Sequence, residues 1–216
     1  MAQLTRPIAV AVAAAAALTL AAPAASAATT TVVQVGTDTA YSGNILASLV
    51  SPTADVSTSL GGGSCTASTL SGTVQSDGTA LNIGAATFTG CDTAVVVAQN
   101  VPWNSGNITY APVAGGRDGT LTLAGFRVQA TVTGWFGTIT CAYGGNITAS
   151  FFNPTNTARP YPAVAEAQAA LSGASVSKTG GSFLCPGSAT VTAAYQVLGE
   201  TAAGSGTFTQ SLYITG

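Results

Sequence analysis

Residues 65–91 read CTASTLSGTVQSDGTALNIGAATFTGC, and they show a pattern that returns along the whole chain. Apolar Leu70 and Val74 alternate with threonine and serine, and the alternation resumes at Leu81 and Ile83 after a polar turn. A period of two residues is the signal of a β-strand with one buried face. The stretch therefore predicts two neighbouring strands joined by a turn.

A second Asp-Gly dipeptide, Asp118-Gly119, lies between further alternating runs. Asp-Gly adopts the positive φ angles of a two-residue type I′ turn, so both dipeptides are interpreted as hairpin turns with Asp77 and Asp118 as turn formers. Alternation returns over 191–197 and 208–214. Many short strands with frequent turns favour an all-β sandwich or barrel, and we predict an antiparallel β-sandwich, immunoglobulin-like or related.

The segment 162–171 carries both a helical and a strand signal. Proline near its start and Gly173 beyond its end suit a helix, whereas Glu166 and Gln168 alternate with alanines as in a strand. We predict a strand, because the neighbouring segments are strands. The stretch 153–162 is rich in proline and asparagine and is predicted to be a loop.

A single β-sandwich domain is predicted for 28–216, because no linker-like stretch divides it. Each successive pair of cysteines encloses strand-like residues, which indicates two related halves, 28–113 and 114–216. A chain of this length buries roughly 70% of its unfolded surface, so one core suffices.

The cysteines Cys65, Cys91, Cys141 and Cys185 favour two disulfides, since an even count in an exported chain is typical of a disulfide framework. Three pairings are possible, and we favour Cys65–Cys91 with Cys141–Cys185. Loop-entropy arithmetic gives these two closures roughly 3.5 and 4 kcal/mol. A metal site is the weaker alternative, because the chain has no histidine and no C-x-x-C motif.

Residues 1–27 are predicted to be a cleaved secretory signal peptide. Arg6 supplies the positive start, the apolar run 8–20 is too short for a stable membrane-spanning helix, and a small-residue cleavage site ends at Ala27. An uncleaved anchor is the alternative. We expect a secreted, extracellular protein that associates with the cell surface and spans no membrane once the signal is removed.

Charged residues are unusually scarce. Five Lys or Arg and seven Asp or Glu make up 6% of the 216 residues, against about 25% in ordinary soluble domains. Without histidine there is no Ser-His-Asp triad, no Cys-His pair and no histidine-ligated metal. Five basic residues and a net charge of −2 exclude nucleic acid as the expected partner.

No constellation of residues predicts catalysis, so we expect no enzyme, no catalytic residue, no cofactor and no metal. The chain lacks a G-x-S-x-G motif, and Lys178, the one lysine, lies in a polar turn and is interpreted as solvated. The acidic residues are dispersed, although a fold can bring two together. A secreted hydrolase with an unrecognised carboxylate pair is therefore kept as an alternative.

Aromatic side chains are the best candidates for a binding site, because their flat faces stack on sugar rings. Trp103 and Trp135 are candidate ligand-binding residues, with burial in the core beside a disulfide as the competing interpretation. Tyr161 lies between two prolines and is the aromatic that we expect to be most exposed.

A resemblance adds to these observations. The segments that carry it are CTASTLSGTV (65–74), DGT (77–79), ATFTGC (86–91), VPW (101–103), TCAYGG (140–145), LCP (184–186) and AAY (193–195). They resemble small exported bacterial β-proteins, actinobacterial members among them, some of which are described as activators of alkane oxidation. The resemblance implies action at the cell surface, in biofilm and adhesion. Its motifs consist of scaffold residues, so it carries over no functional residue.

Together these features predict a secreted, non-catalytic structural or adhesion protein that acts through a neutral, β-rich surface. Its expected partners are cell-wall polymers, a surface, or further copies of itself. The alternative is a module that binds a carbohydrate or a small apolar ligand with exposed aromatics.

Overall fold

The computed structural model describes residues 29–134 and 137–216, which form β-strands without a helix in those ranges. The strands are β1 (Thr31–Gln34), β2 (Gly43–Leu49), β3 (Ala54–Thr58), β4 (Gly61–Val74), β5 (Leu81–Cys91), β6 (Val95–Ala98), β7 (Trp103–Tyr110), β8 (Gly119–Gly134), β9 (Gly137–Phe152), β10 (Ala167–Gly181), β11 (Ser188–Glu200) and β12 (Phe208–Thr215). The all-β prediction is confirmed. The predicted signal peptide, 1–27, lies outside the described residues.

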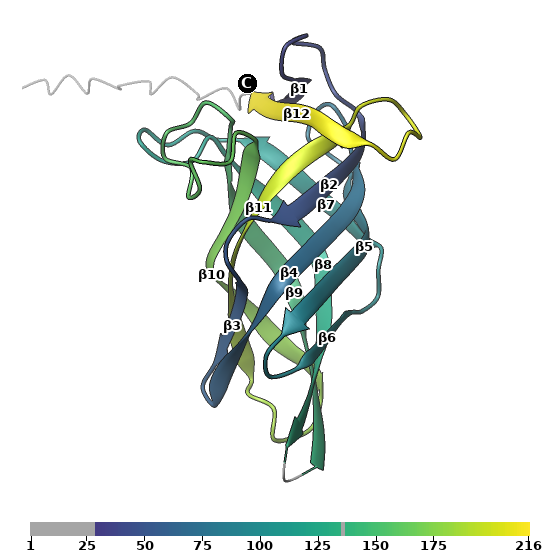
Figure 1. The fold of residues 1–216 in the computed structure, drawn as a ribbon, viewed down its shortest axis with the longest axis vertical. Coiled ribbons are helices and arrows are strands. Elements are labelled where there is room, and N and C mark those ends of the chain that lie inside the picture. Colours follow the sequence, from purple (N-terminus) through teal and green to yellow (C-terminus); the bar gives the residue numbers. More distant parts are fainter. Residues whose placement is uncertain (1–28, 135–136) are drawn as a thin grey trace, which may run out of the picture.

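Eight of the strands close on themselves to form an antiparallel barrel (Figure 1). The ring runs β2-β4-β5-β7-β8-β9-β10-β11, and it closes where β11 pairs with β2, from Tyr195 opposite Leu49 to Gly199 opposite Ile45. The prediction of a β-sandwich is therefore wrong. Sandwiches and barrels both bury every second residue of a strand, so alternation in the sequence does not distinguish them.

Both predicted halves of the chain enter this one barrel. Residues 28–113 provide β1 to β7, and residues 114–216 provide β8 to β12. The halves meet twice around the ring, where β7 pairs with β8 and where β2 pairs with β11. Neither half therefore has a closed sheet of its own.

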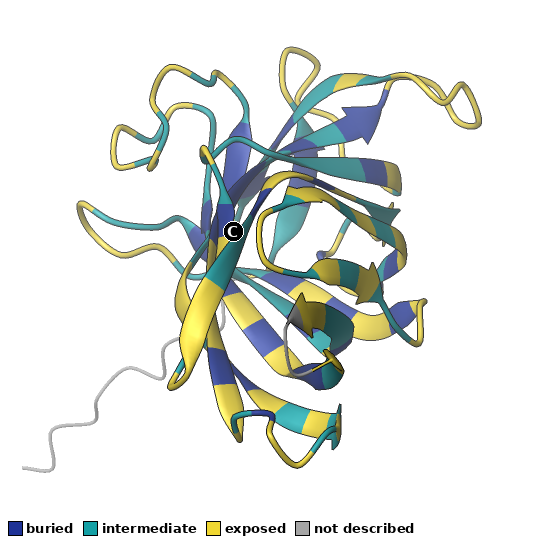
Figure 2. Ribbon diagram, turned by 60° about the horizontal axis from the view of Figure 1, so that its bottom comes forward, coloured by how far each residue is buried: buried dark blue, intermediate teal, exposed yellow. Residues whose placement is uncertain are grey.

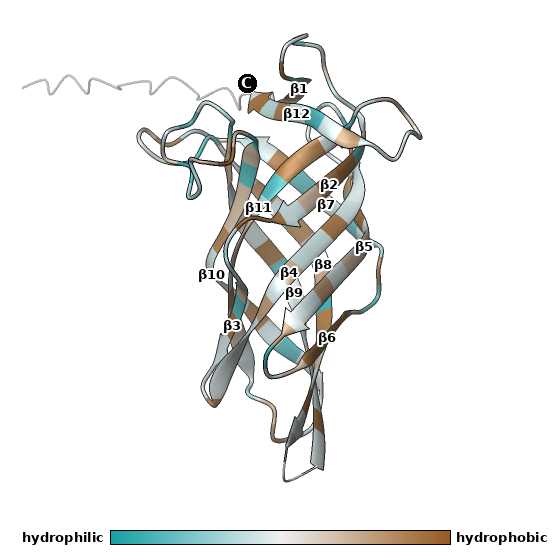
Figure 3. Ribbon diagram, viewed as in Figure 1, coloured by the Kyte–Doolittle hydropathy of each residue, from teal (hydrophilic) through white to brown (hydrophobic). Residues whose placement is uncertain are grey.

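Each strand of the barrel alternates between interior and solvent. Buried and exposed bands alternate along the ribbons in Figure 2, and apolar bands alternate with paler ones in Figure 3. On the outer wall, threonines face each other across neighbouring strands: the Oγ1 atoms of Thr69 and Thr87 lie 2.7 Å apart, and those of Thr122 and Thr148 lie 3.3 Å apart. Cross-strand threonine pairs stabilise a sheet. They give the barrel a polar exterior that needs few charges.

Two positions in the ring are each filled by two short strands. β3 lies beyond β2 and pairs with the same neighbours, β4 and β11, while β6 pairs with β8 beyond the end of β7. The breaks at 50–53 and 99–102 contain Pro52 and Pro102. Proline has no N–H to donate to a neighbouring strand, which explains why the ladder stops there.

The two ends of the barrel differ (Figure 1). At the end drawn uppermost, β1 and β12 pair with each other, and their side chains Val32, Leu212 and Ile214 are buried in the core. We call this the closed end. The opposite end, called the mouth end, carries the connections β3–β4 (59–60), β5–β6 (92–94) and β10–β11 (182–187), together with β6 and the neighbouring ends of β8 and β9 (Figure 1).

Both predicted disulfides are present, and both lie toward the mouth end. Cys65 and Cys91 are directly opposite each other on β4 and β5, with their Cα atoms 3.9 Å apart. Cys141 on β9 is bonded to Cys185 in the β10–β11 connection, with a Cα–Cα distance of 5.7 Å. Two such bonds are typical of a protein that folds in an oxidising environment.

Candidate functional site

The interior of the barrel contains an apolar cavity of about 130 Å³. Side chains from β2–β6 and β8–β11 line it: Ile45, Ala47, Ala54, Val56, Cys65, Leu70, Leu81, Ile83, Phe88, Val96, Leu121, Leu123, Phe126, Val128, Ile147, Ala149, Ala169, Leu171, Val191, Tyr195 and Val197. The hydroxyl of Tyr195 is the polar side-chain group in this set. The cavity is therefore suited to an apolar occupant.

The cavity exists because several inner-wall side chains are small. Ala47, Ala149 and Ala169 line it, whereas Trp103 and Phe151 fill the interior toward the closed end. An eight-stranded barrel is just wide enough for its own side chains to fill or for one small ligand. Alanine at inner positions of several strands leaves room for one small ligand.

A pair of buried hydroxyl groups forms a polar site in the barrel interior that can hydrogen-bond a ligand. The hydroxyl of Tyr195, on β11, lies 3.2 Å from Oγ of Ser68, on β4, and both residues are buried. Burial raises the pKa of Tyr195, against a smaller lowering by the bond to Ser68. The tyrosine therefore stays protonated at neutral pH, and the pair remains uncharged.

The barrel wall beside the cavity is not hydrogen-bonded throughout. β5 pairs with β7 through Leu81 and Ile83, and within the described part of the chain no ladder joins the rest of β5 to β6. Phe88 from β5 and Val96 from β6 both line the cavity. Along this seam the cavity is separated from the exterior by side chains and not by a continuous ladder.

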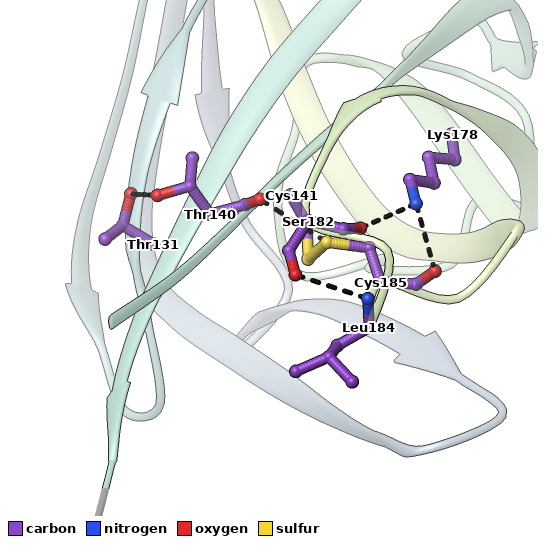
Figure 4. The surroundings of a disulfide bond; sticks show 7 residues. All are labelled: Thr131, Thr140, Cys141, Lys178, Ser182, Leu184 and Cys185. Carbon is purple, nitrogen blue, oxygen red and sulfur yellow. Dashed lines mark hydrogen bonds between the residues drawn. A yellow bond between two sulfur atoms is a disulfide. The ribbon is translucent and has the colours of Figure 1, made fainter. Parts of the chain in front are cut away.

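The β10–β11 connection, 182–187, is fixed to the mouth end of the barrel (Figure 4). Its Cys185 is bonded to Cys141 of β9. Nζ of Lys178 donates to the carbonyl oxygen of Ser182 at 2.6 Å and lies 3.5 Å from that of Cys185. The interpretation of Lys178 as a solvated side chain is wrong, because its ammonium group is held by the carbonyls of this connection.

Trp103 lies in the core, with 1% of its surface exposed. Its indole N–H donates to the carbonyl oxygen of Gln99 at 2.9 Å, and its ring centroid is 4.9 Å from that of Phe126, tilted by 56°. Trp103 is therefore not an exposed ligand platform: it is buried in the core, as in the competing interpretation, but packs against Phe126 and not beside a disulfide. Because Phe126 lines the cavity, Trp103 supports the site from behind. Trp135 lies outside the described residues.

Tyr161 is half-buried and borders a groove of about 160 Å³ between the connections 50–53 and 153–166. Its backbone is held by Gln168, whose amide oxygen accepts from the Tyr161 N–H at 3.1 Å and whose Nε2 donates to the Tyr161 carbonyl at 2.7 Å. The hydroxyls of Ser172 and Thr192 belong to residues of the same groove. The expectation that Tyr161 is the most exposed aromatic is wrong, since it is half-buried while Phe183 is 90% exposed.

Of the two aspartates predicted as turn formers, Asp77 has that role, whereas Asp118 lies at the end of its connection, directly before β8, and accepts from residues of the 153–166 connection. Asp77 Oδ1 accepts a bond of 2.9 Å from the backbone N–H two residues later, and Asp118 Oδ2 accepts one of 2.7 Å from Asn153. Their turns are longer than the two residues predicted, since the connections span 75–80 and 111–118. Across 29–134 and 137–216, no three His, Cys, Asp or Glu side chains gather as a metal site.

The sequence interpretation did not identify the cavity. Its signal is alanine at alternating, inward positions on several strands, as in Ile45-x-Ala47, Ile147-x-Ala149 and Ala167-x-Ala169. In one strand alone this pattern reads as ordinary small-residue packing. Only the ring of strands brings Ala47, Ala149 and Ala169 around one cavity.

Comparison of the chain with protein-family models, with curated proteins and with solved structures finds no match in any of the three. Where the structure describes the chain, it contains no helix that is long and apolar enough to cross a membrane. The function is therefore argued from the site.

Proposed function

We propose that this protein is exported and binds one small, uncharged, apolar molecule inside its barrel without catalysing a reaction. The observation that carries the proposal is the cavity of about 130 Å³, whose wall is apolar apart from the hydroxyl of Tyr195. Two disulfides and the predicted signal peptide support a location outside the cytoplasm. The proposal develops the small-apolar-ligand alternative, with the site moved from exposed aromatics to the barrel interior.

The volume and chemistry of the cavity indicate the class of ligand. A dry, apolar cavity of about 150 Å³, made in another protein by removing a core side chain, binds benzene. By this comparison the barrel accepts a benzene-sized hydrocarbon or a short alkyl chain. A charged ligand is excluded, because the wall offers no partner for a desolvated charge. A single hydroxyl group on the ligand has a hydrogen-bonding point at Tyr195 and Ser68.

Filling the cavity tests the proposal. We expect Ala47→Phe, on the inner face of β2, to weaken the binding of benzene and hexan-1-ol by about tenfold or more, because the added ring takes the volume of the ligand. Ala67→Phe, at an exposed position on β4, is the matched control and should bind as the wild type does. Isothermal titration measures both. No binding by the wild type, or equal affinity of Ala47→Phe and wild type, would overturn the proposal.

A second substitution distinguishes the contribution of the cavity volume to ligand affinity from that of the Tyr195 hydroxyl group. Tyr195→Phe removes only the hydroxyl group, so benzene should bind with unchanged affinity while hexan-1-ol binds more weakly. If both ligands lose affinity equally, the hydroxyl pair supports the wall and does not contact the ligand.

A second candidate function is association with an uncharged wall polymer, as expected from the sequence. It is supported by the threonine-rich outer wall and by the groove in which Tyr161 lies beside Ser172 and Thr192. A sugar ring can stack on the tyrosine while the hydroxyls hydrogen-bond it. Tyr161→Ala should then abolish retention on isolated cell-wall glycan, and Ala47→Phe should not. Unchanged retention of Tyr161→Ala would reject this candidate.

A further inference from the structure

Exposed hydrophobic side chains are concentrated at the mouth end of the barrel. Among the described residues the large exposed ones are Val35, Leu60, Val95, Val97, Val101, Val113, Val132, Phe183 and Leu184. Six of these nine belong to the mouth end: Leu60, Val95, Val97, Val132, Phe183 and Leu184. Scattered exposed hydrophobics are normal on a protein surface, whereas a concentration at one end indicates an interaction site.

The two most exposed of these side chains lie at the tips of neighbouring connections. Phe183 is 90% exposed in the β10–β11 connection, and Leu60 is 77% exposed in the turn between β3 and β4. These connections are neighbours around the barrel, because β3 pairs with β11 from Ser57 opposite Thr190. In Figure 1 both connections project from the lower end of the barrel. The two connections therefore project from the same end of the barrel (Figure 1).

The tips carry no charge, and two charged groups at this end, Asp92 and Lys178, are engaged by the protein's own polar atoms. Asp92, in the β5–β6 connection, accepts bonds from the backbone N–H and the hydroxyl of Ser64 at 2.8 and 3.2 Å. Lys178 donates to carbonyl oxygens of the β10–β11 connection. With a net charge of −2, the chain gains nothing from an anionic surface. The mouth end thus suits a surface without net charge.

We propose that the mouth end docks on a lipid surface of zwitterionic headgroups, with Leu60 and Phe183 inserted among the acyl chains. Apolar side chains at an interface bind in proportion to the apolar area they bury. Leu60 and Phe183 belong to two separate connections, β3–β4 and β10–β11. A lipid layer deforms around separate tips, while a protein partner needs a matching surface. The docked mouth also places the apolar cavity next to the apolar layer.

Vesicle binding tests this proposal without any cavity ligand. We expect the disulfide-bonded protein to co-sediment with phosphatidylcholine vesicles, and Leu60→Ser with Phe183→Ser together to lower the partition coefficient by about a hundredfold, roughly tenfold for each side chain. Val113→Ser is the matched control, because Val113 is also exposed but belongs to the closed end. It should bind as the wild type does. Adding phosphatidylserine should not strengthen binding.

Three outcomes would overturn the docking proposal. The first is no binding of the wild type to neutral vesicles, and the second is equal loss in Val113→Ser. The third is concentration-dependent dimerisation that the double substitution abolishes, which would assign the tips to a second copy of the chain. Benzene affinity in solution, measured on the same double variant, should stay unchanged. A loss of benzene affinity would show that the double substitution disturbs the cavity. Failure of docking and failure of ligand binding are therefore distinguishable.

Discussion

Glu200 is a buried carboxylate, 5% exposed, whose oxygens are all engaged by the protein. It accepts hydrogen bonds from the N–H groups of Gly206 and Gly204 at 2.5 and 3.0 Å and from Nδ2 of Asn44 at 2.7 Å. These bonds, with that from Gly206 the strongest cause, hold the pKa of Glu200 below its ordinary value. One side chain thus ties the β11–β12 connection to β2 close to the point where the barrel closes.

The lowered pKa of Glu200 predicts a loss of stability in acid. The unfolded chain binds a proton at the ordinary glutamate pKa, while the folded chain resists it until a lower pH. The stabilisation is therefore complete above the unfolded pKa and disappears as the pH falls through the folded pKa. Glu200→Gln should be less stable than wild type at pH 7, and the difference should shrink below pH 4 (an approximate limit set by the ordinary glutamate value). Urea unfolding at both pH values measures it, and a constant difference would contradict the assignment.

Side chains differ in how far the sequence alone reveals their role. The cysteine pairing was predictable, because only three pairings exist and each chosen pair closes a loop of moderate length. Trp103 was ambiguous, since its burial depends on Phe126 and Gln99 and on the ring of strands that brings them together. Lys178 was misread for the same reason: its partners are carbonyls of a connection whose path is set by a disulfide.

At the scale of elements, the β10–β11 connection combines an exposed apolar tip with a covalent tie. Cys185 anchors it to β9, and Lys178 holds two of its carbonyls, so Phe183 is presented on a restrained backbone. Restraint lowers the entropy cost of inserting a side chain into another phase. The Cys141–Cys185 disulfide therefore holds Phe183 in an exposed position in addition to stabilising the fold.

Removing this disulfide tests that role. Cys141→Ala with Cys185→Ala should lower the free energy of unfolding by about 4 kcal/mol and increase hydrogen exchange across 182–187. Cys65→Ala with Cys91→Ala is the comparison: we expect a loss of about 3.5 kcal/mol without faster exchange in the β10–β11 connection. Equal exchange of this connection in wild type and in both variants would show that the disulfide does not restrain it.

Strands were more predictable than their connections. Period-two alternation and the Asp-Gly dipeptides placed neighbouring strands on either side of Asp77 and Asp118, yet both connections proved longer than two residues. Asp118 is held by the backbone N–H of Asn153, a distant partner that a local pattern does not reveal. The strand expected over 162–171 begins only at Ala167, since 162–166 belong to the preceding connection. Polar residues in that connection bond to partners such as Gln168 that a local pattern does not reveal.

At the scale of the whole molecule, closure of the ring depends on both halves of the chain. The pairs β2–β11 and β7–β8 each join residues from 28–113 to residues from 114–216. We therefore expect one cooperative unfolding transition, with fluorescence and circular dichroism giving the same midpoint. Residues 114–216 expressed alone should remain unfolded. Two separate transitions, or a folded half, would contradict the single-barrel description.

The closed barrel was beyond what the sequence could predict. Alternation predicts which face of a strand is buried but does not say whether the first and last strands meet. That contact, Leu49 opposite Tyr195, joins distant parts of the chain and leaves no local signature. The cavity follows from closure, because Ala47 and Ala149 line one interior only once the ring is complete. The wrong sandwich prediction and the failure to predict the cavity thus have the same cause: closure of the barrel depends on a pairing between distant strands.

The pairing of β1 with β12 has a practical consequence. Thr31 lies opposite Thr215, so the beginning of the described chain and its last strand are side by side at the closed end, far from the mouth (Figure 1). A fluorescent reporter or an immobilisation tag joined after Thr215 would stand on the side away from Leu60 and Phe183. The molecule can thus be attached to a sensor chip with its mouth end presented to the sample.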